Sequence, residues 1–271
     1  MITVRISFEK KNEASYISLL DLQRVMQRVL KRSGLPVWHT LGFNPHIYMT
    51  FACPLSLGQE SECECVDVKT EAEAPDFAQW KTALNAIMPA GIVITRVAPV
   101  QMKADRIAWA CYQITYPAEA AAVLDQYNAL ESAPVEKHGK KGNKIIELKQ
   151  HIPQVAYAAE GAAVRIELCL PASQELNLNT SLLTGFLEEK FGLPAASAGI
   201  LRTKFLTEDK PLFACAGAND IPLKAPLGLS VLRCARKRGP LDKTENFCIY
   251  FGQNACIQAR FVLSYLGVSV R

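Results

Sequence analysis

The spacing of hydrophobic residues along the chain predicts strands and helices in a definite order. Residues 4–8 alternate with polar neighbours, which is typical of a strand with one buried face. From Ser18 the spacing becomes helical, and Asp21 lies where it can complete a capping box with Ser18. The apolar face of this helix consists of Leu22, Val25, Met26, Val29 and Leu30. The first forty residues therefore predict a strand followed by an amphipathic helix.

The next sixty residues complete a recognisable pattern. Two strands are expected at about 47–55 and 63–70, a helix over 76–88 and a strand over 92–97. The resulting order is β-α-β-β-α-β, the ferredoxin-like arrangement, in which two helices cover one face of an antiparallel sheet. We expect residues 1–100 to form one such unit.

The same order of elements recurs further along the chain. Strands are expected at 108–116, 145–149, 163–170 and 200–206, with helices over 118–130 and 180–191. The chain is therefore expected to be α+β, with two tandem ferredoxin-like units at 1–100 and 106–207. Residues 208–271 show weak periodicity and predict an irregular tail, with at most a short helix or strand over 258–270. One hypothesis is that this tail is the product of an altered gene end and is not native in sequence.

Charge and cysteine usage narrow the classes of function. Residues 215–271 hold 8 Lys and Arg against 3 Asp and Glu, so the remainder of the chain contributes −1 to the total of +4. A neutral body argues against strong non-specific binding of nucleic acid but leaves room for local basic patches. No apolar run approaches the roughly 18 residues that span a bilayer, and the first residues are patterned as a strand, not as a signal peptide. We expect a cytoplasmic protein in which most of the nine cysteines are free thiols.

Most motifs that carry chemistry are absent from the sequence. It contains no phosphate-binding glycine loop, no nucleophile elbow and no zinc-protease motif. It also lacks the closely spaced cysteine triplet that holds the iron–sulfur cluster of a radical SAM enzyme. Cys63 and Cys65 share one face of a predicted strand, where they either hold a soft metal or fill the core as small side chains. We expect neither a metal nor a cofactor.

Three stretches are candidates for binding. The Gly-Phe-Asn-Pro-His turn at 42–46 presents Phe43, Asn44 and His46, with a purely structural turn as the alternative. Arg24, Arg28 and Lys31 form a basic helix face that either binds phosphates or is simply solvated. A basic loop after residue 136 contributes Lys137, Lys140 and Lys141, and it either clamps RNA or is a charged surface hairpin. The acidic run Glu60, Glu62, Glu64 and Asp67 is either a docking surface or a solvated strand edge.

Three motifs in order resemble a known family. They are Ser7-Phe8-Glu9-Lys10 with Tyr16-Ile17-Ser18-Leu19-Leu20-Asp21-Leu22-Gln23-Arg24, then Gly42-Phe43-Asn44-Pro45-His46, then Pro54-Leu55-Ser56-Leu57-Gly58-Gln59-Glu60-Ser61. Over residues 1 to about 210, the chain resembles the family of radical SAM-linked proteins, whose shared domain has no known function. Members stand alone or form the C-terminal part of a longer radical SAM protein with a cobalamin-binding-type region. The chain departs from the family pattern at Leu19, where a histidine is usual, and at Ile47 and Tyr48, where proline and a basic residue are usual.

The resemblance implies a supporting role beside a radical SAM enzyme. We expect a non-catalytic accessory or substrate-recognition protein that works with a separately encoded radical SAM enzyme in RNA or ribosome-related modification. One alternative is an RNA-processing endonuclease with tandem ferredoxin-like domains, in which His46 and Lys140 or Lys141 act on RNA. A second alternative is a protein–protein adaptor without RNA binding.

Overall fold

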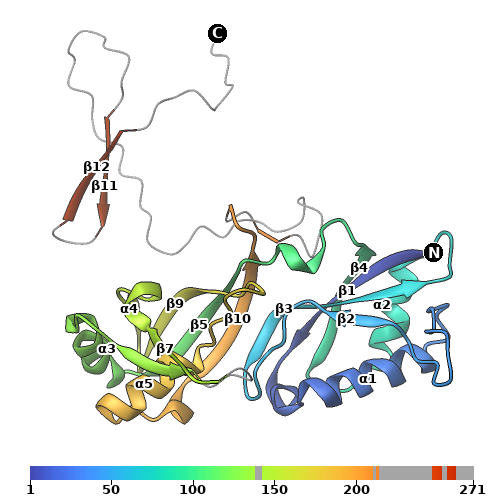
Figure 1. Ribbon diagram of the computed structural model, residues 1–271, viewed down its shortest axis with the longest axis horizontal. Helices are drawn as coiled ribbons and strands as arrows, with labels where there is room; N and C mark the ends of the chain where they lie inside the picture. Colours follow the sequence, from blue (N-terminus) through green and yellow to red (C-terminus); the bar gives the residue numbers. More distant parts are fainter. Residues whose placement is uncertain (138–141, 210–211, 214–245, 252–254, 261–271) are drawn as a thin grey trace, which may run out of the picture. The chain divides into compact units, whose positions relative to one another are not determined.

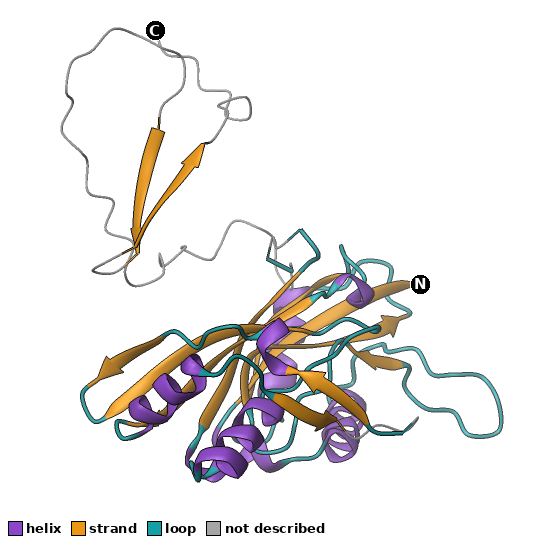
Figure 2. Ribbon diagram, turned by 60° about the vertical axis from the view of Figure 1, so that its left-hand side comes forward, coloured by secondary structure: helices purple, strands orange, loops and turns teal. Residues whose placement is uncertain are grey.

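The computed structural model describes residues 1–137, 142–209, 212–213, 246–251 and 255–260. The chain divides into two compact units, residues 1–221 and 222–271. Unit 1 contains a large sheet and all five α-helices of the described residues. Figure 2 distinguishes the strands of this sheet from the helices that pack against it.

The first half of unit 1 has the element order predicted from the sequence. Its elements are β1 (Ile2–Lys10), η1 (Asn12–Tyr16), α1 (Leu19–Arg32), β2 (Met49–Phe51), β3 (Glu60–Thr70), α2 (Phe77–Asn85) and β4 (Ile92–Pro99). Ser18 caps α1 as expected, since its hydroxyl oxygen accepts the N–H of Asp21 at 3.2 Å. The strand expected at 47–55 is reduced to Met49–Phe51, because the chain leaves β3 after Phe51 and turns towards the second half.

The second half repeats this order with an insertion. Its elements are η2 (Ala104–Arg106), β5 (Trp109–Pro117), α3 (Ala120–Ala129), β6 (Pro134–Lys137), β7 (Lys144–Glu147), α4 (Leu148–His151), β8 (Tyr157–Glu160), β9 (Ala163–Pro171), α5 (Ser181–Phe191), η3 (Ala195–Ser197) and β10 (Gly199–Leu206). Strands β6 and β7 form a separate two-stranded sheet. The sequence predicts a strand at β7 but misses β6, α4 and β8, which are all short.

One continuous sheet joins the two halves. Its strand order is β4-β1-β3-β10-β5-β9-β8, and β2 also pairs with β3. Every pairing in this sheet is antiparallel except that of β3 with β10, where Glu60 lies opposite Leu201 and Ser61 opposite Arg202. The fold is therefore α+β with a mostly antiparallel sheet, and the halves meet along a short parallel contact.

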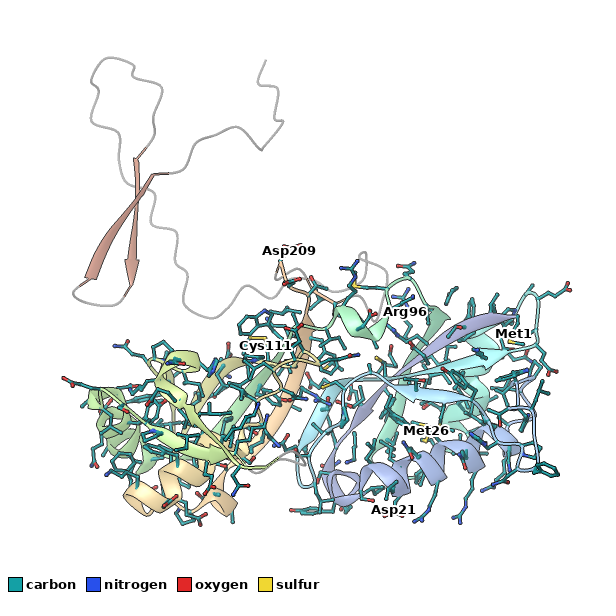
Figure 3. All side chains as sticks on the ribbon, in the orientation of Figure 1. Met1, Asp21, Met26, Arg96, Cys111 and Asp209 are labelled. Carbon is teal, nitrogen blue, oxygen red and sulfur yellow. A yellow bond between two sulfur atoms is a disulfide. The ribbon has the colours of Figure 1, made fainter. Side chains whose placement is uncertain are left out.

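Each half has its own hydrophobic core under its helices. In the first, the α1 face with Leu22 and Met26 packs on Val4, Ile6 and Phe8 of β1. Figure 3 shows Met26 between α1 and the sheet, whereas Asp21 points away from it. In the second core, helices α3 and α5 cover strands β5 and β9, and the cluster also contains Cys53 and Cys65 of the first half. The second core thus extends across the contact between β3 and β10.

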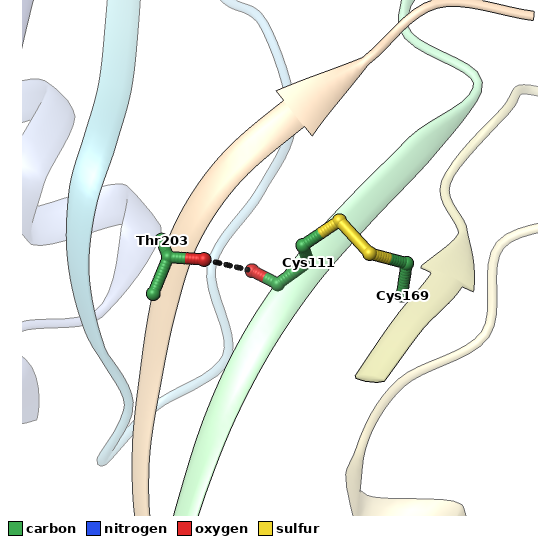
Figure 4. The surroundings of a disulfide bond; sticks show 3 residues. All are labelled: Cys111, Cys169 and Thr203. Carbon is green, nitrogen blue, oxygen red and sulfur yellow. Dashed lines mark hydrogen bonds between the residues drawn. A yellow bond between two sulfur atoms is a disulfide. The ribbon is translucent and has the colours of Figure 1, made fainter. Parts of the chain in front are cut away.

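Two cysteines of the sheet form a disulfide that the sequence does not predict. Cys111 of β5 and Cys169 of β9 lie directly opposite each other and are bonded (Figure 4). The hydroxyl of Thr203 on β10 donates to the carbonyl of Cys111 at 3.3 Å. Cys53, Cys63 and Cys65 are not in a disulfide, so reduced thiols outnumber disulfide-bonded cysteines among those whose side chains the structure describes.

Within the described residues of the predicted irregular tail, one residue packs on the sheet and two segments form a hairpin. Phe213 folds back onto the sheet, where its ring packs against Phe205 and lies 4.9 Å from the Arg5 guanidinium. In unit 2, β11 (Asn246–Phe251) and β12 (Ala255–Arg260) pair as an antiparallel hairpin. Regular structure is therefore present at this hairpin within the segment for which the sequence predicts an irregular tail. Residues 210–211, 214–245, 252–254 and 261–271 of the tail, which include most of the segment 258–270, lie outside the described residues. Among the described helices, none is long and apolar enough to cross a membrane.

Candidate functional site

The turn singled out in the sequence is the end of a longer loop, residues 38–48, which precedes β2 (Figure 1). We call it the 38–48 loop. Its two legs pair with each other, because Thr40 N–H donates to His46 O at 2.8 Å and Tyr48 N–H donates to Trp38 O at 3.3 Å. Ile47 anchors one leg in the core, with 1% of its surface exposed. The legs are thus held to the sheet, and the residues between them form an exposed tip.

The tip carries apolar side chains that face solvent. Leu41 is 90% exposed, and Phe43 is fully exposed. Asn44 and His46 are exposed beside them. A single exposed apolar residue is ordinary, but an aromatic and an aliphatic side chain at the tip of an anchored loop form a small contact surface.

An aromatic cluster supports the loop at its base. The rings of Trp38 and Tyr48 lie edge to face, with centroids 6.1 Å apart. The ammonium group of Lys69 on β3 lies 5.1 Å from the Trp38 ring centroid and 4.5 Å from that of Tyr48. These cation–π contacts link both legs of the loop to β3.

His46 is held by its own loop. Its Nδ1 lies 3.0 Å from Thr40 Oγ1 and 3.1 Å from the carbonyl oxygen of Asn44. The Thr40 hydroxyl oxygen also accepts the backbone N–H of His46 at 3.1 Å. These contacts involve one ring nitrogen and orient the other away from them, on an exposed residue. The structural role proposed for the turn and a binding role for His46 are compatible.

The basic face of α1 is present and exposed. Arg24 donates to the carboxylate of Asp21 at 2.8 Å, and hydrogen bonds from Ser18 and then Arg24 lower the pKa of Asp21. Arg28, Lys31 and Arg32 are exposed, and within the described residues no ion pair neutralises them. Helix α1 ends at Arg32 and the 38–48 loop begins at Trp38. Positive charge therefore accumulates at the end of the helix that leads into the loop.

The third predicted stretch is only partly described. Lys137, the last residue of β6, donates from Nζ to the carbonyl oxygen of Asn177 at 2.6 Å. That contact ties Lys137 to the segment between β9 and α5. Lys140 and Lys141 lie outside the described residues. The structure thus places Phe43, Asn44 and His46 on one loop, places Arg24, Arg28 and Lys31 on the preceding helix, and leaves Lys137 on a different hairpin.

A buried polar cluster at the meeting of the two halves was missed by the sequence analysis. The guanidinium of Arg202 on β10 binds the carboxylate of Glu64 on β3, with Nε 3.0 Å from Oε1 and Nη2 on the same oxygen. It also donates to the carbonyl oxygens of Cys53 at 3.0 Å and Pro54 at 3.2 Å. The only available signal was an arginine within a predicted strand, directly after the apolar residues Ile200 and Leu201.

The cluster shifts several pKa values. Burial is the largest single influence on the pKa of Arg202 and lowers it, but attraction to Glu64, with further contributions from Tyr112, Cys53 and Cys63, together outweighs burial and the pKa is raised. Burial raises the pKa of the Cys53 thiol, with Arg202 acting in the opposite direction. Burial also lowers the pKa of Lys10, whose ammonium donates to the carbonyl oxygens of Ser15 and Ile17 at 3.2 and 2.8 Å. The arrangement keeps Arg202 charged and Cys53 protonated, so it is suited to holding the halves together.

This geometry corrects the interpretation of the acidic run on β3 as either a docking surface or a solvated edge. Glu64 is buried against Arg202, and Asp67 forms a two-pronged ion pair with Arg5 at 2.7 and 2.8 Å. Glu62 pairs with Lys11 at 2.8 Å. Because β3 lies in the interior of the sheet, between β1 and β10, most of these carboxylates meet cations of neighbouring segments and present no continuous acidic surface.

Cys63 and Cys65 of β3 pack in or against the hydrophobic core. Cys65 is buried, and Cys63 packs against the core that Cys65 shares with the second half. Among the described residues, no group of three or more potential ligands could hold a metal ion. These thiols therefore pack beside the Arg202 cluster.

The comparisons with known proteins give a family. Among curated proteins, none matches the chain. A family model described as "uncharacterized protein conserved in bacteria (DUF2344)" matches residues 3–180. The match includes α1, the 38–48 loop, β3 and the inserted β6–β7 hairpin, and it covers well over half of the sequence. The chain therefore belongs to this family of uncharacterized proteins conserved in bacteria.

Proposed function

We propose that the protein is a non-catalytic recognition subunit that binds RNA, or an RNA-containing ribosomal component, for a separately encoded radical SAM enzyme. The observation that carries the proposal is the succession of an exposed basic helix face and an exposed aromatic tip along one stretch of chain. Single-stranded RNA is bound by this pair of features: cations contact the phosphates and aromatic rings stack on the bases.

The fold supports the same proposal at the level of architecture. The first half has the strand order β4-β1-β3-β2, and the second half has the order β10-β5-β9-β8. The two strand orders correspond position by position, and we infer from this correspondence two ferredoxin-like units joined through β3 and β10. Tandem units of this kind offer helices, loops and a sheet face that are held at fixed positions, which suits recognition of an extended ligand.

The enzyme partner follows from the resemblance to the radical SAM-linked proteins. The sequence contains no cysteine triplet for a radical SAM cluster, so the chemistry would reside in a second protein. The chain would then position the substrate. No cofactor of its own is required for that role.

The test is a titration of fluorescently labelled single-stranded RNA at several salt concentrations. We expect salt-sensitive binding, because phosphate contacts release counterions. Replacing Arg28 and Lys31 by Gln should flatten the salt dependence by roughly 1–2 in the slope of log K against log salt. Phe43→Ala should cost about 1–3 kcal/mol of binding, the amount typical of one stacked base. Lys81→Gln removes one exposed positive charge from α2 and is the matched control.

The other two functions are distinguished by the same material. Cleavage of the RNA in the presence of EDTA, abolished in His46→Ala, would establish the endonuclease instead. Absence of salt-sensitive binding, together with capture of a protein partner, would establish an adaptor. Equal binding by Lys81→Gln and by the Arg28/Lys31 double variant would refute the assignment to α1.

A further inference from the structure

A second candidate site lies at the contact between the two halves, away from the 38–48 loop. A cavity of about 490 Å³ is open to solvent there, and it is lined from both halves. Its polar lining includes Ser15 and Tyr16 of η1 with Glu60 from the first half, and Gln113 and Thr115 of β5 from the second. The volume lies in the range of sites for small ligands or single side chains.

The charge of the lining is one-sided. Among the described residues that line the cavity, Glu60 alone carries a full charge, and none is Lys, Arg or His. The nearby cations are engaged elsewhere: Lys10 with backbone carbonyls, Lys11 with Glu62 and Glu9, and Arg202 with Glu64. Glu60 has no ion-pair partner among the described residues. The carboxylate therefore provides a negative site without a counter-charge.

Glu60 is held in place by an unusual backbone conformation. Its Oε1 accepts the N–H of Asn12 at 2.8 Å. Asn12 has φ +53°, the left-handed region, and is the one residue other than glycine with positive φ in the part of the chain that the structure describes. Strained backbone of this kind is often retained where it positions a functional group. Here it directs a donor at one carboxylate oxygen.

An exposed aromatic ring lines the same cavity as this carboxylate. Tyr16 lines the cavity although 74% of its surface is exposed, and a Cβ added at Gly58, another lining residue, would lie 3.9 Å from the Tyr16 ring. A carboxylate and an accessible aromatic face together favour organic cations, by charge and by cation–π attraction. Gln113 and Thr115 add side-chain oxygens that accept hydrogen bonds. An anionic ligand such as a phosphate finds no counter-charge in this lining.

We propose that this cavity binds an alkylammonium or guanidinium group, supplied either by a lysine or arginine side chain of a polypeptide or by a free amine. The Glu60 carboxylate pairs with the cation and Tyr16 covers it at the cavity mouth. This proposal does not rest on RNA binding by α1 and the 38–48 loop, and it concerns a ligand of the opposite charge.

The test uses the full-length protein and three probes measured by calorimetry and by Tyr16-sensitive chemical-shift changes. The probes are acetyl-Gly-Arg-Gly-amide, the same peptide with citrulline in place of arginine, and agmatine. We expect saturable binding of the arginine peptide, weakened at least about tenfold by the neutral citrulline and by Glu60→Gln. Gln at position 60 keeps a carbonyl oxygen for the Asn12 N–H, so the fold is retained. Agmatine binding as tightly as the arginine peptide identifies a free amine as sufficient, whereas preference for the peptide identifies a polypeptide source.

Glu13→Gln is the control for general electrostatics. Glu13 is an exposed carboxylate of η1 close in sequence to Tyr16, but it is not part of the cavity lining. We expect its loss to change the affinity less than twofold. Equal affinity for arginine and citrulline peptides, an equal effect of Glu13→Gln and Glu60→Gln, or absence of saturable binding would each overturn the proposal.

Discussion

The ion pair between Arg202 and Glu64 gives the sharpest prediction about stability. Arg202 is 1% exposed and Glu64 5%, so the pair is withdrawn from water. Glu64→Gln removes the negative charge and preserves the size of the side chain. The donors of Arg202 keep the carbonyl oxygens of Cys53 and Pro54, at 3.0 and 3.2 Å. The substitution therefore isolates the cost of a buried guanidinium without its carboxylate.

The magnitude follows from burial. Breaking a buried ion pair by removing one partner costs about 3–5 kcal/mol. Because two carbonyls still solvate Arg202, we expect the lower end, about 3 kcal/mol. In a domain of this size that corresponds to roughly 6–12 °C in Tm. The free energy of unfolding is measured by urea denaturation followed by circular dichroism.

Two further variants make this prediction refutable. Glu62→Gln breaks the exposed pair with Lys11 and should cost less than about 1 kcal/mol. Glu64→Met combined with Arg202→Met removes both charges and should be more stable than Glu64→Gln, since no uncompensated charge stays buried. If Glu64→Gln costs no more than Glu62→Gln, the pair does not hold the halves together. If the double variant is the least stable of the three, the cost of Glu64→Gln does not come from an uncompensated buried charge.

Three other predictions follow from the cores. Gly91→Ala should destabilise by at least about 1–3 kcal/mol in urea denaturation, because Gly91 has φ +79° and an added Cβ would lie 2.5 Å from Lys11 O. Burial raises the pKa of Tyr116 and of Tyr127 to about 12, above the ordinary value of 10.0. The stability that each neutral, buried phenol contributes is therefore complete below pH 10 and is lost as the pH rises towards 12. Ultraviolet titration of the phenols and alkaline unfolding should show both changes over the same pH range. Replacing Cys111 and Cys169 by Ser should lower the free energy of unfolding by up to about 4 kcal/mol, the value expected for a crosslink between residues 58 apart. The variant is compared with the wild type under oxidising and under reducing conditions.

Local patterning predicted the elements that have strong periodicity. Helix α1 was predicted because its apolar face and its cap at Ser18 agree, and the structure confirms both. Strand β2 was predicted too long, because its shortening depends on a distant partner. After Phe51 the chain leaves β3, and the carbonyl oxygens of Cys53 and Pro54 accept hydrogen bonds from Arg202. These residues are far apart in the sequence, so no local pattern predicts the contact.

The candidate site shows the same division. The basic face of α1 could be predicted from helical spacing, and the exposure of the turn from its Gly, Asn and Pro residues. The Trp38–Lys69–Tyr48 cluster could not, because Lys69 is far along the chain and meets the loop only once β2 pairs with β3. The ion pair between Glu64 and Arg202 could not be predicted either, because it depends on the parallel pairing of β3 with β10.

The most direct measurement of the central claim is a tagged pull-down from the native cell, analysed for both protein and RNA. It is made in parallel with the wild type and with a variant carrying Phe43→Ala, Arg28→Gln and Lys31→Gln. The account predicts that a radical SAM enzyme and RNA both accompany the wild type, and that the variant keeps the enzyme but loses most of the RNA. Recovery of RNA in equal amounts by wild type and variant, or recovery of neither enzyme nor RNA by the wild type, would contradict it.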